Sequence, residues 1–224
     1  TQARRPHGWV PHIGMPKTGT TTLQTALYAN RELLADRGYF YPDFGARQHF
    51  PLVRKLAEDI GAPPGGFPAV GDCGPFDRFV DLLEREGRGA HTSIISSENF
   101  FLRLAIMSAA PEVRREKTLS WLEKAVERTA QYFAGCDVTV LLWLRRQDHW
   151  LMSYYKEAVK TSFYSDDLWA FADQTIGTEF FRILQFWINA FGRERVHCRS
   201  YDALVATGTS SVAAFLATVC PDIP

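Results

Sequence analysis

The residues best suited to chemistry lie between a short apolar run and an amphipathic segment near the amino terminus. Gly14 and Gly19 stand five positions apart, the spacing of the two glycines in a Walker A loop, G-x-x-x-x-G-K-[ST]. Thr20 follows Gly19 at the position where Walker A has its lysine, and the nearest lysine is Lys17. The pattern therefore predicts a phosphate-binding loop that differs from a standard ATP or GTP loop.

The residue types in this loop suit the binding of an anion. The first turn of a helix carries N–H groups without partners and a partial positive charge, so it attracts oxyanions. Gly19 lets the backbone approach a phosphate closely, and Thr20, Thr21 and Thr22 add hydroxyl donors. Lys17 adds a full charge that can follow a bridging or leaving oxygen.

A second group of candidate residues follows the most strand-like stretch of the chain, residues 137–144. Arg145 and Arg146 come directly after it, and Ser153 lies in the helix expected next. Ligands of open α/β sheets bind beyond the carboxyl ends of the strands, and a guanidinium group matches phosphate oxygens in bidentate fashion. We therefore expect Arg145 and Ser153 to hold a terminal phosphate. The alternative is a surface arginine pair that solvates a strand end.

Strand-like and helix-like segments alternate, which predicts an α/β fold: a single P-loop-like domain over 1–224 with a central, mostly parallel sheet flanked by helices. Strands are expected near 9–15, 39–41, 91–97, 137–144 (central) and 196–199, and helices near 20–36, 50–60, 76–86, 116–134, 147–160, 166–174, 178–191 and 209–219. The stretch 61–75 is rich in Gly and Pro and is expected to be a surface loop or lid. The chain ends soon after its last expected helix, so a C-terminal segment that completes an acceptor pocket could follow Pro224.

Composition restricts the class of protein further. The 224 residues are 46% hydrophobic, enough for one sizeable α/β domain. The 25 basic and 25 acidic residues cancel, which gives no indication of nucleic acid or an anionic membrane as a partner. The four cysteines lack metal-site spacing and are expected to be reduced thiols, and no segment has the length of a membrane span. We therefore expect a soluble, cytoplasmic protein.

Several motifs together resemble a known family. Pro16–Leu23 resembles the 5′-phosphosulfate-binding loop of the sulfotransferases that use 3′-phosphoadenosine 5′-phosphosulfate (PAPS). Arg145, followed eight residues later by Ser153, resembles the 3′-phosphate-binding motif of that family. The stretches Ile94–Glu98 and Phe180–Leu204 fit the same pattern, and the chain is most similar to the bacterial, carbohydrate-type branch.

The resemblance implies transfer of a sulfuryl group from PAPS to a hydroxyl or amine of a carbohydrate or small metabolite. The product nucleotide would be 3′-phosphoadenosine 5′-phosphate (PAP), and no metal would be required. Arg145 and Ser153 would bind the 3′-phosphate. The residues that would bind the 5′-phosphosulfate are Lys17, Thr18, Gly19, Thr20, Thr21 and Thr22.

The general base that takes the acceptor's proton has two candidates. In the family it is a histidine or a glutamate at a variable distance after the loop. His49 is favoured because imidazole titrates near neutral pH and is the commonest general base. Glu98, at the end of the strand expected near 91–97, is the alternative. His12, on the first expected strand, is interpreted as a core histidine.

Two other functions remain open. A P-loop kinase of a small metabolite should have lysine at Thr20 and an acidic Mg²⁺ ligand at a strand end, whereas the strongest strand here ends in arginines. A non-catalytic nucleotide-binding homologue would need no base at all. The presence of Lys17, Arg145 and Ser153 favours an enzyme over such a homologue.

Overall fold

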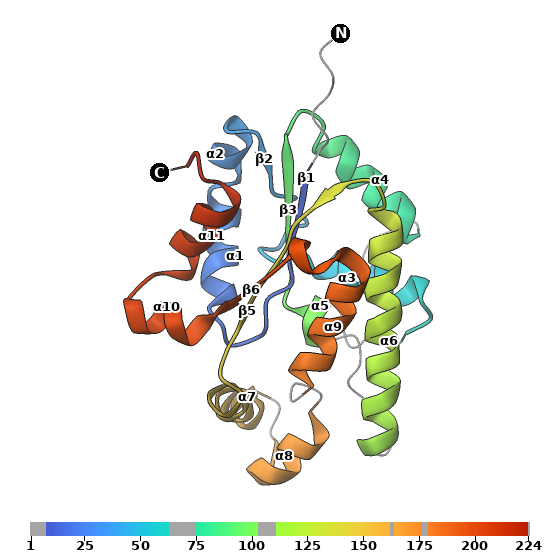
Figure 1. Ribbon diagram of the computed structural model, residues 1–224, viewed down its shortest axis with the longest axis vertical. Coiled ribbons are helices and arrows are strands. Elements are labelled where there is room, and N and C mark those ends of the chain that lie inside the picture. The colour runs from blue at the N-terminus through green and yellow to red at the C-terminus, as the bar shows by residue number, and fades with distance from the viewer. Residues whose placement is uncertain (1–7, 63–74, 103–110, 162–163, 176–178, 224) are drawn as a thin grey trace.

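The computed structural model describes residues 8–62, 75–102, 111–161, 164–175 and 179–223 (Figure 1). Most of the loop predicted at 61–75 lies outside these ranges, as does Cys73. The other three cysteines, Cys136, Cys198 and Cys220, carry free thiols.

The described strands form one parallel sheet in the order β2-β3-β1-β5-β6, and β4 also pairs with β1. Their bounds are β1 Gly8–His12, β2 Tyr39–Phe40, β3 Thr92–Ser96, β4 Asp137–Val138, β5 Val140–Leu144 and β6 Val196–Ser200. The expected strand over 137–144 is interrupted at Thr139, whose N–H donates to the carbonyl of Trp9. Its main part, β5, is an interior strand between β1 and β6, whereas the middle position in the strand order belongs to β1. Strand order depends on pairing between residues far apart in the chain, which local pattern does not reveal.

The helices agree with the expected segments except at four places, one of which is that the helix expected over 116–134 begins at Pro111. Their bounds are α1 Thr20–Ala29, α2 Arg31–Asp36, α3 Phe50–Asp59, α4 Phe76–Glu86, α5 Asn99–Leu102, α6 Pro111–Tyr132, α7 Gln147–Thr161, α8 Leu168–Gln174, α9 Phe180–Phe191, α10 Tyr201–Thr207 and α11 Ser211–Val219, with a short 3₁₀ turn at Arg193–Arg195. The expected helix over 20–36 is two helices that meet at Asn30, and α5 and α10 were not expected. No single helix in the described ranges is long and apolar enough to cross a membrane; α10 and α11 meet that test only as a pair bent by 112°.

Helices cover both faces of the sheet (Figure 1). Helices α1, α2, α10 and α11 lie on one face and α3, α4, α6 and α9 on the other, while α7 and α8 lie beyond the carboxyl ends of the strands. Alternation along β5 sends Leu141 and Trp143 into the first layer and Leu142 into the second, and all three are buried. A strand buried on both faces reads as a continuous apolar run, as expected for a parallel sheet. The predicted α/β class, with a mostly parallel sheet flanked by helices, is confirmed.

Candidate functional site

The predicted phosphate loop connects β1 to α1 and contains two left-handed residues. Lys17 has φ of 67° and Gly19 has φ of 76°. The Thr18 hydroxyl donates to the Met15 carbonyl at 2.6 Å and so closes the loop on itself. Gly14 is also required, because a Cβ there would lie 2.7 Å from Nε2 of His12. A non-glycine residue in the left-handed region is uncommon and is concentrated at functional sites.

Helix α1 begins with its N-terminus open. Its N-cap is Gly19, no side chain caps its first turn, and that turn contains no acidic residue. The hydroxyl of Thr20 is buried and donates to Oε2 of Glu98 at 2.6 Å, whereas Thr21 and Thr22 are exposed. The N–H groups of this turn therefore remain suited to an anion. The hydroxyls of Thr18 and Thr20 are already engaged within the protein.

Arg145 follows β5 and contacts the loop. Its Nη1 donates to the carbonyl of Lys17 at 3.2 Å, and its guanidinium carbon lies 5.7 Å from the centre of the Tyr201 ring. Nε of Arg145 is buried and has no hydrogen-bond partner among the described residues. A buried donor of this kind is normally satisfied. The structure thus brings together two of the predicted residues, Lys17 and Arg145, which are far apart in the sequence.

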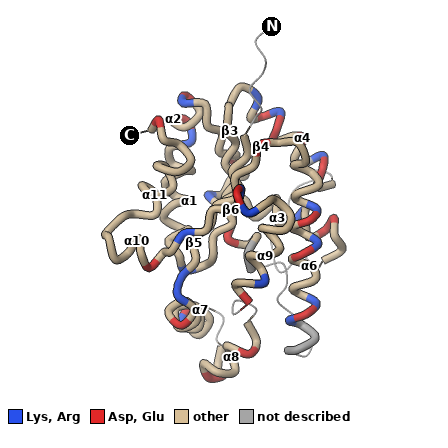
Figure 2. The backbone as a smooth tube through the Cα atoms, viewed as in Figure 1, with Lys and Arg blue, Asp and Glu red and all other residues tan. Residues whose placement is uncertain are grey.

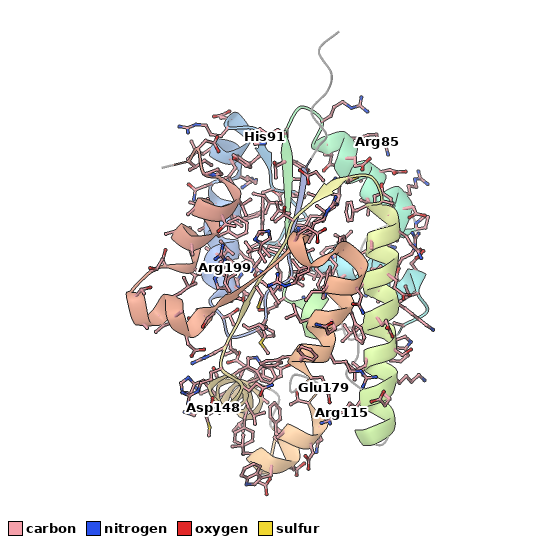
Figure 3. All side chains as sticks on the ribbon, in the orientation of Figure 1. Arg85, His91, Arg115, Asp148, Glu179 and Arg199 are labelled. Carbon is pink, nitrogen blue, oxygen red and sulfur yellow. The ribbon has the colours of Figure 1, made fainter. Side chains whose placement is uncertain are left out.

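Arg146 points elsewhere. Its guanidinium donates twice to the carboxylate of Asp148, at 2.6 and 2.7 Å, and its side chain is 65% exposed. Figure 3 shows Asp148 at the start of α7. The backbone N–H of Arg146 donates to Asp202, and this bond is the main reason why the pKa of the Asp202 carboxyl is lowered. The two consecutive arginines, seen in blue between β5 and α7 in Figure 2, therefore have different roles.

One face of α7 packs against the loop. Nε1 of Trp150 donates to the Pro16 carbonyl at 3.1 Å, and Glu157 pairs with Nζ of Lys17 at 3.2 Å. Ser153 lies three residues after Trp150 and four before Glu157, so helical spacing places it on the same face. The predicted Arg145–Ser153 pair therefore lies on the α7 side of the loop.

These residues lie together at the carboxyl edge of the sheet. Neighbouring strands β1 and β5 are followed by connections that lead to opposite sides, because the chain goes from β1 to β2 and from β5 to β6. A reversal of this kind is where open α/β sheets bind ligands. Lys17 is in the connection after β1 and Arg145 is in the connection after β5.

Glu98 lies on the other side of the loop. It follows β3, which also pairs with β1, and its half-buried carboxylate accepts the hydrogen bond from Thr20. The sequence showed no acid at the end of the strongest strand, but the structure places this acid beside the loop from a different strand. The reason is the position of β3 next to β1, which the sequence pattern did not predict.

His49, the favoured base, is in a different environment from the one expected. Its side chain is fully buried, Nδ1 accepts from the N–H of Ser96 at 2.9 Å, and Nε2 donates to the Pro42 carbonyl at 3.1 Å. Burial lowers the pKa of His49 to about 3. Both ring nitrogens are therefore engaged in joining β3 to the segment before α3, and neither is open to an acceptor.

His12 is a buried core residue, as predicted, although its Nε2 has no hydrogen-bond partner among the described residues. Its Nδ1 hydrogen-bonds with Oγ of Ser96 at 2.8 Å, and burial lowers the pKa of His12 to about 3. Gln24 of α1 donates to the same hydroxyl at 3.2 Å. Ser96 thus connects β1, β3, α1 and, through His49, the N-terminus of α3. This network fixes the floor beneath the loop.

Two residues at the site were not singled out from the sequence. Glu157 could have been found from its helical spacing to Ser153, because positions i and i+4 share a face. Tyr201 gives no such signal, since its contact with Arg145 and its position near Gly19 depend on the packing of α10. Among the described residues, no group of three or more His, Cys, Asp or Glu side chains could hold a metal ion.

Comparison with known proteins gives a likeness of fold. No family model and no curated protein matches the chain. Among solved structures, the crystal structure of a sulfotransferase from Alicyclobacillus acidocaldarius is 16% identical, with a TM-score of 0.55, and the match covers 96% of this chain and 81% of that one. The chain therefore has a sulfotransferase-like α/β fold.

Proposed function

We propose that this protein is a sulfotransferase that moves a sulfuryl group from PAPS to a hydroxyl or amine of an acceptor and releases PAP. The observation that carries the proposal is the meeting of Lys17, Arg145 and the uncapped start of α1 at the carboxyl edge of the sheet. This arrangement offers two cations and a helix N-terminus to an anionic ligand. The sulfotransferase-like fold supports the same reading.

The residues present fit a nucleotide with two separate anionic groups. The buried Nε of Arg145 has no partner in the described part of the chain, and a phosphate oxygen would satisfy it. Ser153 on the facing side of α7 would hold the same 3′-phosphate. The donor, when bound, supplies the activated sulfuryl group on its 5′-phosphosulfate.

The 5′ side would be bound mainly by backbone N–H groups. Thr18 and Thr20 use their hydroxyls within the protein, so we assign them, with Gly19, to binding through the main chain. Thr21 and Thr22 are exposed in the first turn of α1 and can add their hydroxyls. Lys17 would stabilise the charge that develops on the leaving phosphate, by electrostatics that are already in place before reaction.

We assign the role of general base to Glu98 in preference to His49. The Glu98 carboxylate is half-buried beside the loop, within hydrogen-bond distance of Thr20, whereas both nitrogens of His49 are engaged. A carboxylate that accepts the acceptor's proton leaves the oxygen or nitrogen free to attack in line. The acceptor we propose is a carbohydrate or another small metabolite, on the family resemblance of the sequence.

One observation favours a second candidate, a small-metabolite kinase. An acid at the end of a strand beside the phosphate loop, bonded to a loop hydroxyl, is an arrangement that could also hold Mg²⁺ near phosphates. Against it stands Thr20 in place of the Walker lysine. Binding of Mg-ATP in preference to PAP would favour this candidate.

The first experiment is calorimetric titration of the purified protein with PAP, ADP and Mg-ATP. We expect micromolar binding of PAP that requires its 3′-phosphate. Arg145→Ala should weaken PAP binding by about 10- to 100-fold, the usual effect of losing a hydrogen bond to a charged group. The matched control is Arg146→Ala, which removes the neighbouring guanidinium that pairs with Asp148, and it should leave affinity within about twofold.

The outcomes separate the candidates. Equal losses in the two arginine variants would contradict the assignment of Arg145. Absence of any nucleotide binding would contradict the proposed function. Transfer of a labelled sulfuryl group from PAPS to a member of an acceptor panel, with formation of PAP, would distinguish an enzyme from a non-catalytic homologue that only binds PAP.

A further inference from the structure

The cation of the phosphate loop already has an anionic partner. Nζ of Lys17 lies 3.2 Å from Oε2 of Glu157, a residue of α7 that is 140 positions away in the sequence. The two side chains are 31% and 48% exposed, so the ion pair lies at the open side of the loop. A loop that binds an anion is thus found with its lysine charge balanced by a carboxylate.

The backbone on both sides of this ion pair is held in place. The carbonyl of Lys17 accepts a hydrogen bond from Arg145, and its φ of 67° belongs to the closed loop. Helix α7 is held against the same loop by the buried Trp150, whose Nε1 donates to Pro16. The parts that can separate are therefore the two flexible side chains, and the backbone need not move.

The energetics favour an exchangeable contact. A solvent-exposed ion pair contributes little to stability, because water screens it and both long side chains lose freedom when it forms. A bound phosphate offers Lys17 more than one anionic oxygen, and the phosphate is also held by the N–H groups of α1 beside it. An anion in the loop can therefore take Lys17 away from Glu157, and Glu157 can take it back when the anion leaves.

We propose that Glu157 is a positioning residue that holds Nζ of Lys17 on the α7 side of the loop before the nucleotide binds and competes with the nucleotide for it. The proposal rests on the proposed function, because the competing anion is the 5′ group of the nucleotide. Glu157 lowers the affinity for PAP and speeds its release, and it does so only through Lys17. It has no role in taking or giving a proton.

A double-mutant cycle tests this with four proteins: the wild type, Glu157→Gln, Lys17→Met and the double variant. In the wild-type background, where Lys17 is present, Glu157→Gln should tighten PAP binding by about two- to fivefold, mainly through slower dissociation. This factor corresponds to the free energy that an exposed ion pair contributes. In the Lys17→Met background the same change should have no effect. Equal tightening in both backgrounds would show that Glu157 acts as a general negative charge, and it would overturn the proposal, as would unchanged or weaker binding in Glu157→Gln.

Asp148→Asn provides the matched control. It removes one negative charge from the same helix, where Asp148 pairs with Arg146. PAP affinity in this variant should equal that of the wild type. Tightening equal to that of Glu157→Gln would contradict a role specific to Glu157.

A measurement without nucleotide separates this proposal from the proposed function. In protein with ¹³C-labelled lysine, the Cε resonance of Lys17 is identified by its loss in Lys17→Met. That resonance should shift in Glu157→Gln and stay in place in Asp148→Asn. An unchanged resonance would overturn the ion pair itself, whereas failure of the wild type to bind PAP, with the shift present, would overturn only the nucleotide assignment and the competition built on it.

Discussion

Lys17 combines the two properties that most affect the site at the scale of single residues. It carries the charge of the loop, and it occupies a left-handed backbone conformation that costs a non-glycine residue about 1–2 kcal/mol. Strain of this kind persists only where the surrounding structure over-determines it. The site needs a charged side chain at this position, whereas the backbone conformation would be less strained with glycine.

Replacement of Lys17 can separate the charge from the strain. We expect Lys17→Ala and Lys17→Gly to lower sulfuryl transfer alike, by about 100-fold or more, because both remove the charge that stabilises the leaving group. Lys17→Gly should have a free energy of unfolding about 1 kcal/mol higher than Lys17→Ala, since glycine tolerates positive φ. Urea denaturation and steady-state kinetics measure the two effects. Equal stability of the variants would argue against strain at this residue.

Replacement of Glu98 should affect turnover, whereas replacement of His49 should affect the free energy of unfolding. Glu98→Gln should lower turnover by about 100-fold or more and leave PAP affinity nearly unchanged, because it removes the base but keeps a hydrogen-bond acceptor for Thr20. His49→Ala should lower the free energy of unfolding by at least about 2 kcal/mol, since it leaves Ser96 N–H and the Pro42 carbonyl without partners. Kinetics and urea denaturation of both variants test this. Normal turnover in Glu98→Gln would remove Glu98 as the base.

At the scale of elements, the site is formed where the segments that follow β1, β5 and β6 meet. The β1–α1 loop supplies Lys17, the connection after β5 supplies Arg145, and α10 and α11 support the loop from the side. Ser211 of α11 donates to the carbonyl of Gly19 at 3.5 Å, and Tyr201 of α10 lies beneath Arg145. The carboxyl-terminal helices therefore contribute to the shape of a loop near the amino terminus.

Two glycines with the same backbone conformation test this arrangement. Gly19 and Gly61 have φ of 76° and 71°, but a Cβ at Gly19 would lie 3.2 Å from Ser211 Oγ, whereas nothing lies within 4 Å of a Cβ at Gly61. Both alanine variants should lose about 1 kcal/mol of stability through the left-handed conformation. Only Gly19→Ala should weaken PAP binding, by about tenfold or more, because it displaces donors of the loop. Calorimetry on the two variants checks this, and equal affinities would contradict it.

At the scale of the whole molecule, two histidines are fully buried, His12 at the end of β1 and His49 directly before α3. His12 and His49 both have a pKa lowered by burial to about 3, and both hydrogen-bond to Ser96. They hold the strand ends beneath the loop in their neutral forms. The stability of the fold therefore depends on pH through these two histidines, which lie beneath the loop.

The sign of this linkage follows from the two pKa values. The unfolded histidines take up protons near pH 6.5 and the folded ones only near pH 3, so between these values the unfolded chain binds more protons. Stability should be fully present above about pH 6.5 and should fall as the pH is lowered, by up to about 1.4 kcal/mol per pH unit for each histidine. Urea denaturation between pH 7 and about pH 5, above the range of most carboxyl groups, measures the slope. A flat profile would contradict the burial of neutral histidines.

Much of the fold and part of the site followed from local pattern. The loop from Gly14 to Thr20, the start of α1 and the alternation of strands with helices depend on residues within a few positions of one another, and these predictions are confirmed as structure. The break of the first expected helix at Asn30 is also a local feature, but Asn30 makes no side-chain cap for the second helix. The unexpected α10 has clear local signals, an N-cap at Ser200 whose side chain accepts from the N–H of Ala203 and a left-handed Gly208 at its end, which were not used in predicting the helices. The roles of Lys17, Arg145 and Ser153 in binding remain predictions.

The sequence alone determined an α/β chain with a strand–loop–helix segment whose lysine precedes its second glycine, because helix starts, tight turns and apolar runs depend on neighbouring residues. Only the tertiary structure decided which distant residues meet that loop. The pairing of β3 with β1 brought Glu98 to Thr20, the packing of α7 brought Glu157 to Lys17, and burial beneath the loop engaged both nitrogens of His49. Apart from the bond between His49 and Pro42, which are seven positions apart, these contacts join residues 47 to 140 positions apart, and they form only when the whole sheet and its two helical layers exclude water together.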